Sequence, residues 1–335
     1  MRRCTRCVLP ATFPGITFDS KGICNFCRDQ APPRDEAERK ARARSRFERL
    51  AGRVRRLPGI QCLMAYSGGK DSTYTLMILR RVYGLRVLAV TMDNGFLSPQ
   101  ALANARRVVE ALDADQITVK PRMGLLRRIF AACAFGNPFP AKALERASSI
   151  CNACMGIVKS VALRIALERR IPITAWGWSP GQAPVKASAV RLSAAMVARM
   201  QAMRAAPLIE IAGEDLRAYL PDARSPSLDD GFLPYAANPL AFLDYDERRI
   251  VSEIEPLGWR PPEDTDGNST NCLLNCYANR IHLRRYGFHP YVFEIAGLVR
   301  RGLMDRGEGL AKLSDLGSRG AAEAVARRLH LEITF

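Results

Sequence analysis

The stretch that decides the fold is residues 62–73, which read CLMAYSGGKDST. Its first four residues are apolar, as in a buried strand, and a glycine turn and the start of a helix follow. Gly68 and Gly69 let the backbone approach a phosphate closely, and the helix N-terminus adds partial positive charge. Three hydroxyl groups lie at the same place, those of Ser67, Ser72 and Thr73. These features predict a phosphate-binding loop, and because G-x4-G-K-[ST] is absent it is not a Walker A loop. A glycine turn with a helix cap and no ligand is the alternative.

Strands and helices alternate on both sides of this loop. The apolar patterns predict strands at 60–65, 86–92, 116–119 and 173–177, and helices at 71–83, 98–112, 123–134 and 156–169. Alternation of this kind is typical of an α/β fold with a doubly wound parallel sheet. The rhythm breaks after residue 183, where a Met- and Ala-rich helix at 194–205 and a stretch around Ser225-Pro226 suggest an insertion over the active site or an interaction arm.

The segment SGGKDS resembles the PP-motif of the adenine nucleotide alpha-hydrolase superfamily, the PP-loop ATP pyrophosphatases. The resemblance implies that this loop holds the pyrophosphate that leaves ATP, with Mg²⁺, and that Asp71 takes part in catalysis. It continues in VTMDNG at 90–95, which places Asp93 towards the adenosine, and in Gly177 after the fourth strand. There, Trp178-Ser179 replaces the family's usual continuation. The residues that the resemblance assigns to ATP are Ser67, Gly68, Gly69, Lys70, Asp71, Ser72, Thr73, Asp93 and Gly177.

The length of 335 residues allows one large domain with appendages. We expect a zinc-binding module at 1–32, a basic helical linker at 33–58, the ATP-binding domain at 59–183, an insertion at 184–233 and a helical C-terminal region at 234–335. The net charge of +17 suggests a polyanionic partner such as nucleic acid, although the arginines are scattered along the whole chain. No apolar run approaches membrane-spanning length, so we expect a cytoplasmic protein without a membrane partner, and a homodimer is left open.

Four of the ten cysteines form two C-x2-C pairs near the N-terminus, Cys4 with Cys7 and Cys24 with Cys27. Four thiolates on two tight turns suit tetrahedral Zn²⁺ in a closed, structural site. A four-cysteine Fe–S site and oxidised surface cysteines are the alternatives. The segment around these pairs, with FPGITFD between them, resembles the N-terminus of N-acetyl sugar amidotransferases, which also carry a PP-motif and act with an ammonia-producing partner.

A second group of cysteines comprises Cys151 and Cys154 before a predicted helix and Cys272 far downstream. This pattern resembles the tRNA 2-thiouridine synthetases, where the resemblance implies a [4Fe–4S] cluster on three thiolates with one iron open to an exogenous sulfide. A second structural zinc that includes Cys276, and thiol or persulfide chemistry, remain alternatives. Cys276 is either a fourth ligand or a bystander one helical turn away.

Other residue types are less informative. Lys120 and Arg122 follow the third strand and either steady ATP phosphates or are surface charge. Residues 264–268 either bind Mg²⁺ or form a solvated turn, the second being favoured. His282 and His289 are given no role. The basic helix at 40–56 is either a solvated face or an RNA contact.

Together these observations predict an adenylating enzyme. The substrate's carbonyl oxygen attacks the α-phosphate of ATP, pyrophosphate leaves, and sulfur from a donor then replaces that oxygen. The alternative is transfer of nitrogen to an N-acetyl sugar with a glutaminase partner. The acceptor is either tRNA or a small molecule.

Overall fold

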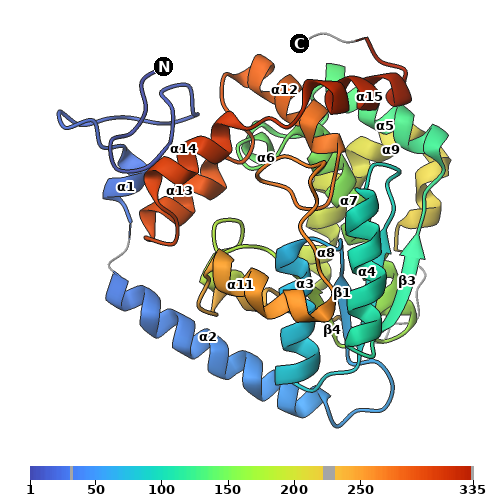
Figure 1. Cartoon of the computed structure of the whole chain (residues 1–335). Coiled ribbons are helices and arrows are strands. Elements are labelled where there is room, and N and C mark those ends of the chain that lie inside the picture. Colours follow the sequence, from blue (N-terminus) through green and yellow to red (C-terminus); the bar gives the residue numbers. More distant parts are fainter. Residues whose placement is uncertain (31–32, 222–230, 333–335) are drawn as a thin grey trace.

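The computed structural model describes residues 1–30, 33–221 and 231–332 (Figure 1). Its centre is a six-stranded sheet with the strand order β3-β2-β1-β4-β6-β5. All neighbouring pairs are parallel except β5 with β6. The strands are β1 (Cys62–Ala65), β2 (Val87–Met92), β3 (Asp115–Val119), β4 (Ile173–Trp176), β5 (Ala189–Arg191) and β6 (Tyr235–Ala237). The predicted fold class, α/β with a doubly wound parallel sheet, is confirmed.

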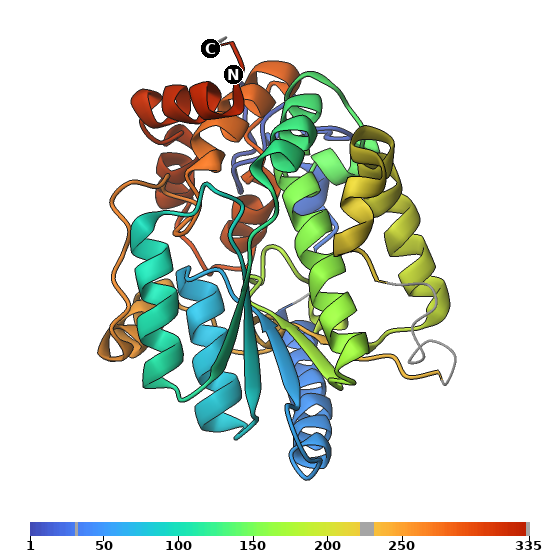
Figure 2. The ribbon, with the colours of Figure 1, turned by 90° about the vertical axis from the view of Figure 1, so that its right-hand side faces the viewer.

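Helices cover both faces of the sheet, as Figure 2 shows edge-on. One face carries α3 (Lys70–Met77), the π-turn η1 (Ile78–Val82), α4 (Pro99–Ala111) and α11 (Glu247–Ile254). The other carries α5 (Met123–Phe135), α7 (Ser149–Glu168) and α9 (Ala206–Ala212). Side chains of β1 alternate between the two cores, with Met64 in the first and Leu63 in the second, because successive strand residues point to opposite faces. Short elements complete these layers: α6 (Ala141–Leu144), η5 (Pro239–Ala241) and η6 (Glu255–Leu257).

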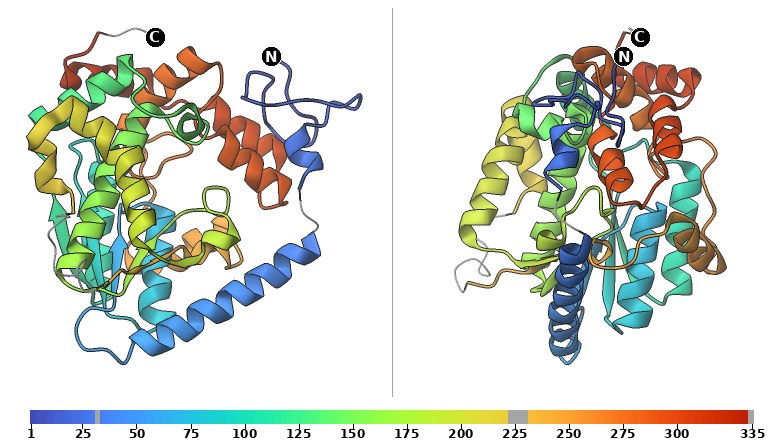
Figure 3. Two further views of the ribbon diagram at one scale, coloured as in Figure 1. Left: turned by 180° about the vertical axis from the view of Figure 1, so that it is seen from behind. Right: turned by 90° about the vertical axis from the view of Figure 1, so that its left-hand side faces the viewer.

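Helix α2 (Pro33–Val54) extends along one side of the molecule (Figure 3). The sequence analysis predicted an exposed basic helix, but one face is buried against the first core. Phe47, for example, has its ring centroid 4.8 Å from that of Tyr83. A face beside the buried one carries exposed arginines at helical spacing, Arg39, Arg42, Arg46 and Arg49. With Lys186 on η2 (Val185–Ala187), they line an open cleft of about 570 Å³.

The segment predicted as an insertion is part of the sheet and of the second helical layer. It supplies β5, α8 (Ala194–Met200), the π-turn η3 (Gln201–Ala205), α9 and η4 (Gly213–Tyr219). Strand β6 follows at Tyr235, where the sequence analysis expected mainly helix. That expectation is wrong for these three residues, whose Ala-Ala pair has little intrinsic preference for a strand. Ser225 and Pro226 lie outside the described residues.

The N-terminal module packs on the C-terminal helices (Figure 1). Besides α1 (Asn25–Arg28), this part contains α13 (Val292–Arg300) and α14 (Arg306–Ser314). The Phe13 ring lies 5.2 Å from that of Phe288, and Arg306 donates to the carbonyls of Cys4 and Cys7 at 3.1 Å. Helices α12 (Leu274–Tyr286) and α15 (Arg319–Leu329) join the second core instead. The C-terminal helices thus pack against both the N-terminal module and the second core of the sheet.

One helix does reach membrane-spanning length, contrary to the sequence-based expectation. Helix α7 is 20 residues long and, by length and composition only, apolar enough to cross a bilayer. Half of that apolar stretch is buried inside the molecule, where residues such as Ile157 and Ala166 pack in the second core. A core helix of an α/β fold has the same composition, so α7 carries no argument for a membrane.

Candidate functional site

The predicted phosphate loop connects β1 to α3 at the carboxyl edge of the sheet. Gly68 has a φ of +75°, and a Cβ there would lie 2.1 Å from the Ala101 carbonyl oxygen, so only glycine fits. Gly69 is the N-cap residue of α3 and has no side chain to cap the helix. The Lys70 amide at the start of α3 donates to Thr270. The next two amides, those of Asp71 and Ser72, face the loop without a side-chain acceptor within it, which is the arrangement that binds phosphate.

The hydroxyl groups of the loop contact one another. Ser67 Oγ lies 3.1 Å from Ser72 Oγ, and Ser72 Oγ donates to the Gly69 carbonyl at 2.9 Å. Thr73 differs, because it is fully buried and its hydroxyl lies 3.1 Å from Tyr66 OH. The Thr73 backbone amide donates to the Gly69 carbonyl at 2.9 Å. In this arrangement Thr73 therefore offers a phosphate neither its amide nor the hydroxyl that the sequence analysis expected.

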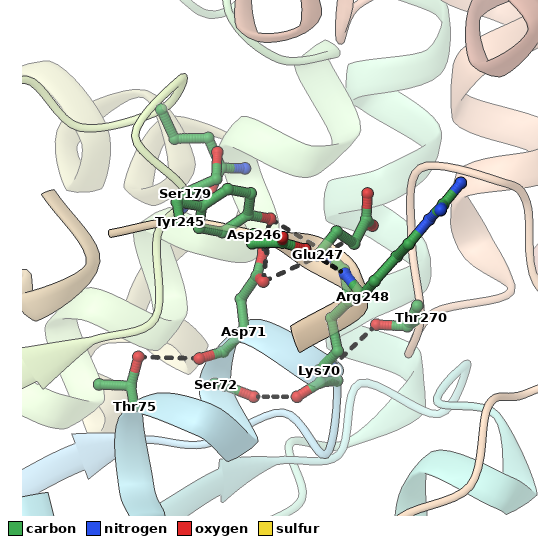
Figure 4. Close-up of polar contacts among 12 residues, drawn as sticks. Lys70, Asp71, Ser72, Thr75, Ser179, Tyr245, Asp246, Glu247, Arg248 and Thr270 are labelled. Carbon is green, nitrogen blue, oxygen red and sulfur yellow. Dashed lines mark hydrogen bonds and ion pairs between the residues drawn. The ribbon is translucent and has the colours of Figure 1, made fainter. Parts of the chain in front are cut away.

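Lys70 and Asp71 form a charged network with two residues from α11 and its approach, shown in Figure 4. Lys70 Nζ lies 3.1 Å from Asp71 Oδ1 and 2.9 Å from Glu247 Oε1. Tyr245 OH donates to Asp71 Oδ1 at 3.1 Å. Burial alone would lower the pKa of Lys70, but Asp71, Tyr245 and Glu247 outweigh it and raise that pKa well above its usual value. Lys70 is therefore charged, and it can contact a phosphate only by exchanging one of these partners for it.

Residues from distant parts of the chain fix the shape of the loop. Trp259, which is almost fully buried, donates its indole N–H to the Gly68 carbonyl at 3.0 Å. Thr270 Oγ1 accepts from the Lys70 backbone N–H at 3.1 Å. Gly177, directly after β4, lies so close that a Cβ there would be 2.5 Å from Ser72 Cα. Gly177 therefore lies next to the loop, as expected, and the space between them is too small for a methyl group.

Asp93 follows β2 at the same edge of the sheet. Its carboxylate accepts from the Gly95 amide at 2.8 Å and pairs with Lys120 Nζ at 2.9 Å. Burial would raise the pKa of Asp93, but Lys120 and the Gly95 amide outweigh it and lower that pKa. Lys120 is thus the partner of Asp93. Arg122 instead pairs with Asp215 at 2.6 Å, away from the loop.

A carboxyl group that the sequence analysis did not select also faces this region. Glu294 on α13 accepts from Ser179 Oγ at 2.6 Å, two residues after Gly177. Burial, together with the charge of Asp71, raises the pKa of Glu294 to about 7. A group that titrates near neutrality and senses Asp71 electrostatically is suited to exchange a proton beside the loop.

Two of the three central cysteines, Cys154 and Cys272, meet at Asn94, the residue after Asp93. Asn94 Nδ2 lies 3.4 Å from Cys154 Sγ and 3.6 Å from Cys272 Sγ. Cys151 Sγ contacts Asn275 Oδ1 at 3.1 Å, three residues after Cys272. Burial raises the pKa of all three thiols, to about 12 for Cys154. The neighbouring charge of Cys272 raises the pKa of Cys151 and Cys154 further.

The distances between sulfur atoms distinguish the central cysteines from the N-terminal cysteines. Among the described residues, only the N-terminal set of metal-ligand atoms has at least three members all within 4.8 Å of one another. The central sulfurs therefore do not have the spacing of ligands around a single ion, which disfavours a second structural zinc. A [4Fe–4S] cluster attaches each cysteine to a different iron, so it takes sulfurs that stand further apart.

Cys276 and Asp266 lie beside the trio. Cys276 is fully buried, and a Cβ at Gly317 would lie 2.4 Å from its sulfur. Asp266 is only 3% exposed, whereas Asp264 and Gly267 are exposed, so the turn that the sequence analysis favoured is solvated only in part. Asp266 Oδ1 accepts from the Asn268 amide at 2.8 Å, and burial raises its pKa to about 6. This turn leads directly into the segment that carries Cys272.

The N-terminal cysteines form a compact, buried tetrad. The Cys4 and Cys27 sulfurs lie 3.8 Å apart, as do those of Cys7 and Cys24. Four sulfurs about 2.3 Å from one zinc ion have edges of about 3.8 Å in a regular tetrahedron. Burial raises the pKa of Cys4, but the amides of Cys7 and Cys24 outweigh it and lower that pKa to about 7. The donor set and spacing fit a single tetrahedral ion and not a multi-iron cluster.

The site contains residues that no local sequence pattern could identify, among them Tyr245, Glu247, Trp259, Thr270 and Glu294. The only sequence signal is the N-cap residue Asp246, which starts α11 by accepting from two amides at 2.9 and 3.1 Å. His282 packs beside Phe288 and His289 beside Tyr291. Burial lowers the pKa of His282 to about 3 and that of His289 to about 4.

No protein-family model matches the chain. An uncharacterized protein from Methanocaldococcus jannaschii is 24% identical over 308 residues, which cover 91% of this chain and 90% of that protein. Among solved structures, the U34-tRNA thiolase NcsA from Methanococcus maripaludis with its [4Fe–4S] cluster gives a TM-score of 0.39 at 17% identity, covering 99% of this chain and 90% of that one. The NMN synthetase from Francisella tularensis gives 0.39 at 11% identity, covering 91% and 99%.

Proposed function

We propose that the protein binds ATP and uses it to adenylate a carbonyl oxygen of an acceptor. The oxygen attacks the α-phosphorus and forms a C–O–P bond, while the bond to the β-phosphate oxygen breaks. Pyrophosphate leaves with that electron pair into the loop of Ser67 to Ser72, where amides of the first turn of α3 offset its charge and Mg²⁺, when bound, would neutralise more of it. Asp71 holds Lys70 in place, and Glu294 is the proposed acceptor of a proton lost in the reaction.

One observation carries this proposal, the segment Thr270–Cys272. Thr270 accepts from the first amide of α3 at 3.1 Å, and Cys272 lies two residues further on. The same segment pairs with the chain after Asp93, since Leu97 and Cys272 form an antiparallel bridge. The phosphate loop, the β2 edge and the central cysteines therefore meet within a few residues, as a two-step reaction on one acceptor atom requires.

We propose sulfur as the atom that is transferred in the second step. Cys151, Cys154 and Cys272 would hold a [4Fe–4S] cluster, which when bound supplies an iron position open to sulfide from a donor. The sulfur forms a bond to the acceptor carbon, and the C–O bond breaks so that AMP leaves with the electron pair. Asn94, whose amide contacts two of the sulfurs, would orient the ligands.

The first test is pyrophosphate release from ATP with Mg²⁺. Ser67→Ala and Asp71→Asn should each lower the rate at least tenfold without loss of folded structure, because they alter the loop and the residue that holds Lys70. Ser314→Ala is a matched control, since its hydroxyl bonds only to its own helix at the Leu310 carbonyl. Wild-type rates in both loop variants would overturn the adenylation proposal.

The second test separates sulfur from nitrogen transfer. Protein prepared without oxygen should be brown, with a broad band near about 400 nm. Cys151→Ala should remove the colour, while Cys276→Ala should keep it because the Cys276 side chain is fully buried and packs against Gly317. Colourless protein that holds two zinc ions per chain would exclude the sulfur proposal and favour the ammonia-dependent amidotransferase, which resembles this chain in its N-terminal cysteine segment.

For the N-terminal tetrad we propose Zn²⁺ with a structural role, since all four ligand positions are taken by buried cysteines. For the acceptor we propose tRNA or a phosphorylated small molecule. The exposed arginines of α2 support a polyanion, because Arg39, Arg42, Arg46 and Arg49 repeat at three- and four-residue intervals on one face.

A further inference from the structure

Lys159 on α7 points its ammonium group at two tryptophans beside the phosphate loop. Its Nζ lies 4.1 Å from the centre of the Trp178 ring and 5.6 Å from that of Trp176. Trp178 directly follows Gly177, the residue in contact with Ser72. Lys159 is therefore close to the site of adenylation but takes no part in the network around Lys70.

Arg204 on η3 lies next to the same turn of α7. Gly156 allows this approach, because a Cβ there would be 3.6 Å from the Arg204 carbonyl and 3.7 Å from its Cβ. Arg204 and Lys159 are both only partly exposed. In the parts of the chain that the structure covers, neither side chain has a hydrogen bond or an ion pair with a carboxylate.

Two half-buried cations that no carboxylate of the described residues neutralises are unfavourable for folding. Burial lowers the pKa of Lys159 well below its usual value, and the charge of Arg204 lowers it further. Burial also lowers the pKa of Arg204. An anion placed between them would offset both effects, since it would supply the missing partner in a site of reduced solvent screening.

The pair also lies close to the proposed sulfur chemistry. Cys154 precedes Lys159 on α7 by five residues, which is about 7.5 Å of helix rise. Trp178 and Trp176 belong to the same packed cluster as Cys151 and Cys272. The tryptophans, Lys159 and the central cysteines therefore lie on the same side of the sheet.

We propose that Lys159 and Arg204, with the ring of Trp178 beside them, form an anion subsite that binds a phosphate group of the acceptor. The subsite rests on the proposed adenylation, and it would hold the acceptor in place while its carbonyl is activated. A phosphate next to a planar ring is the chemistry of a nucleotide, since the tryptophan offers a stacking surface and the cations offer charge-assisted hydrogen bonds. Such a phosphate comes either from an RNA chain or from a free nucleotide.

The experiment measures acceptor binding apart from ATP binding. Wild-type protein is saturated with α,β-methylene-ATP and then titrated with uridine 5′-monophosphate or with a short RNA hairpin. Calorimetry measures the binding of each probe. Lys159→Met and Arg204→Met should each weaken binding of the better probe by about tenfold or more. Arg199→Met is the matched control, because Arg199 is an exposed cation on the neighbouring helix α8, and its affinity should stay within about twofold.

The outcomes separate the two proposals. Binding that depends on Lys159 and Arg204 supports the subsite, and the probe that binds more tightly identifies RNA or a free nucleotide as the source of the phosphate. Unchanged affinity in both variants overturns it, as does loss of α,β-methylene-ATP binding, which would assign the pair to the ATP site. If the probes bind as expected but wild-type protein releases no pyrophosphate, the adenylation proposal fails and the subsite stands.

Discussion

Replacing Gly177 with alanine tests how tightly the end of β4 is fitted to the phosphate loop. The new Cβ would lie 2.5 Å from Ser72 Cα, 2.7 Å from Ser72 N and 2.9 Å from Asp71 C. These are backbone atoms, so no side chain can rotate away. Carbon atoms at contact normally stand about 3.5–4.0 Å apart, and the strand end and the first turn of α3 must therefore separate by about 1 Å.

The displacement has two calculable consequences. Overpacking of this kind typically costs about 1–3 kcal/mol of folding free energy. The amides of the first turn are the proposed phosphate donors, and a shift of about 1 Å moves them out of hydrogen-bonding range, which can cost about a hundredfold in function. We expect Gly177→Ala to remain folded but to bind ATP at least tenfold more weakly, measured by calorimetry beside denaturant unfolding.

Gly52→Ala is the matched control. Gly52 is an exposed residue within α2, and no atom lies within 4 Å of its added Cβ. Alanine should stabilise the helix by about 0.5–1 kcal/mol and leave ATP affinity unchanged. The reasoning would be refuted if folded Gly177→Ala bound ATP with wild-type affinity, because the loop would then tolerate the displacement or lie away from the nucleotide.

Three further outcomes can be measured. Cys24→Ser should lower the zinc content by about one ion per chain, as determined by mass spectrometry, and unfold the N-terminal module first; unchanged zinc would contradict the tetrad. Burial raises the pKa of Glu294 from 4.5 to about 7, so the folded state binds a proton that the unfolded state has lost. Wild-type stability therefore falls as the pH rises from 4.5 through 7. Glu294→Gln should lack this loss when urea unfolding is compared at pH 5 and pH 8. The pH effect of His282 has the opposite sign, because burial lowers its pKa from 6.5 to about 3. Its contribution to stability is complete above pH 6.5 and is lost as the pH falls below that value. His282→Phe should flatten this fall, and curves of stability against pH that run parallel in the variant and the wild type would contradict the prediction.

The local part of the site could be predicted from sequence, because its chemistry is written in consecutive residues. The strand, the glycine turn and the helix start of residues 62–73 fall where expected, with β1 at Cys62–Ala65 and α3 beginning at Lys70. The helix with the central cysteines begins earlier than predicted. Ser148 accepts from the Cys151 amide at 3.1 Å and starts α7 at Ser149, so Cys151 and Cys154 lie inside its first turns.

The remaining features depend on contacts that sequence separation conceals. Tyr245 reaches Asp71 across 174 positions and Trp259 reaches Gly68 across 191, and neither has a neighbouring motif. Strand β6 has only three residues, and its pairing with β4 specifies it more than its composition does. The domain boundaries inferred from composition stay predictions. The apolar face of α2 and the strands β5 and β6 nevertheless pack in the same hydrophobic core as the rest of the sheet.

The contacts of Trp259 and Thr270 with the phosphate loop affect the order in which function arises during synthesis. A growing chain leaves the ribosome from its N-terminus, so the loop at 67–72 emerges long before the residues that shape it. Until Trp259 can donate to the Gly68 carbonyl and Thr270 can accept from the Lys70 amide, the loop lacks the two contacts that hold its turn. A chain that still lacks residues 259–270 therefore lacks the loop shape on which the proposed ATP binding depends.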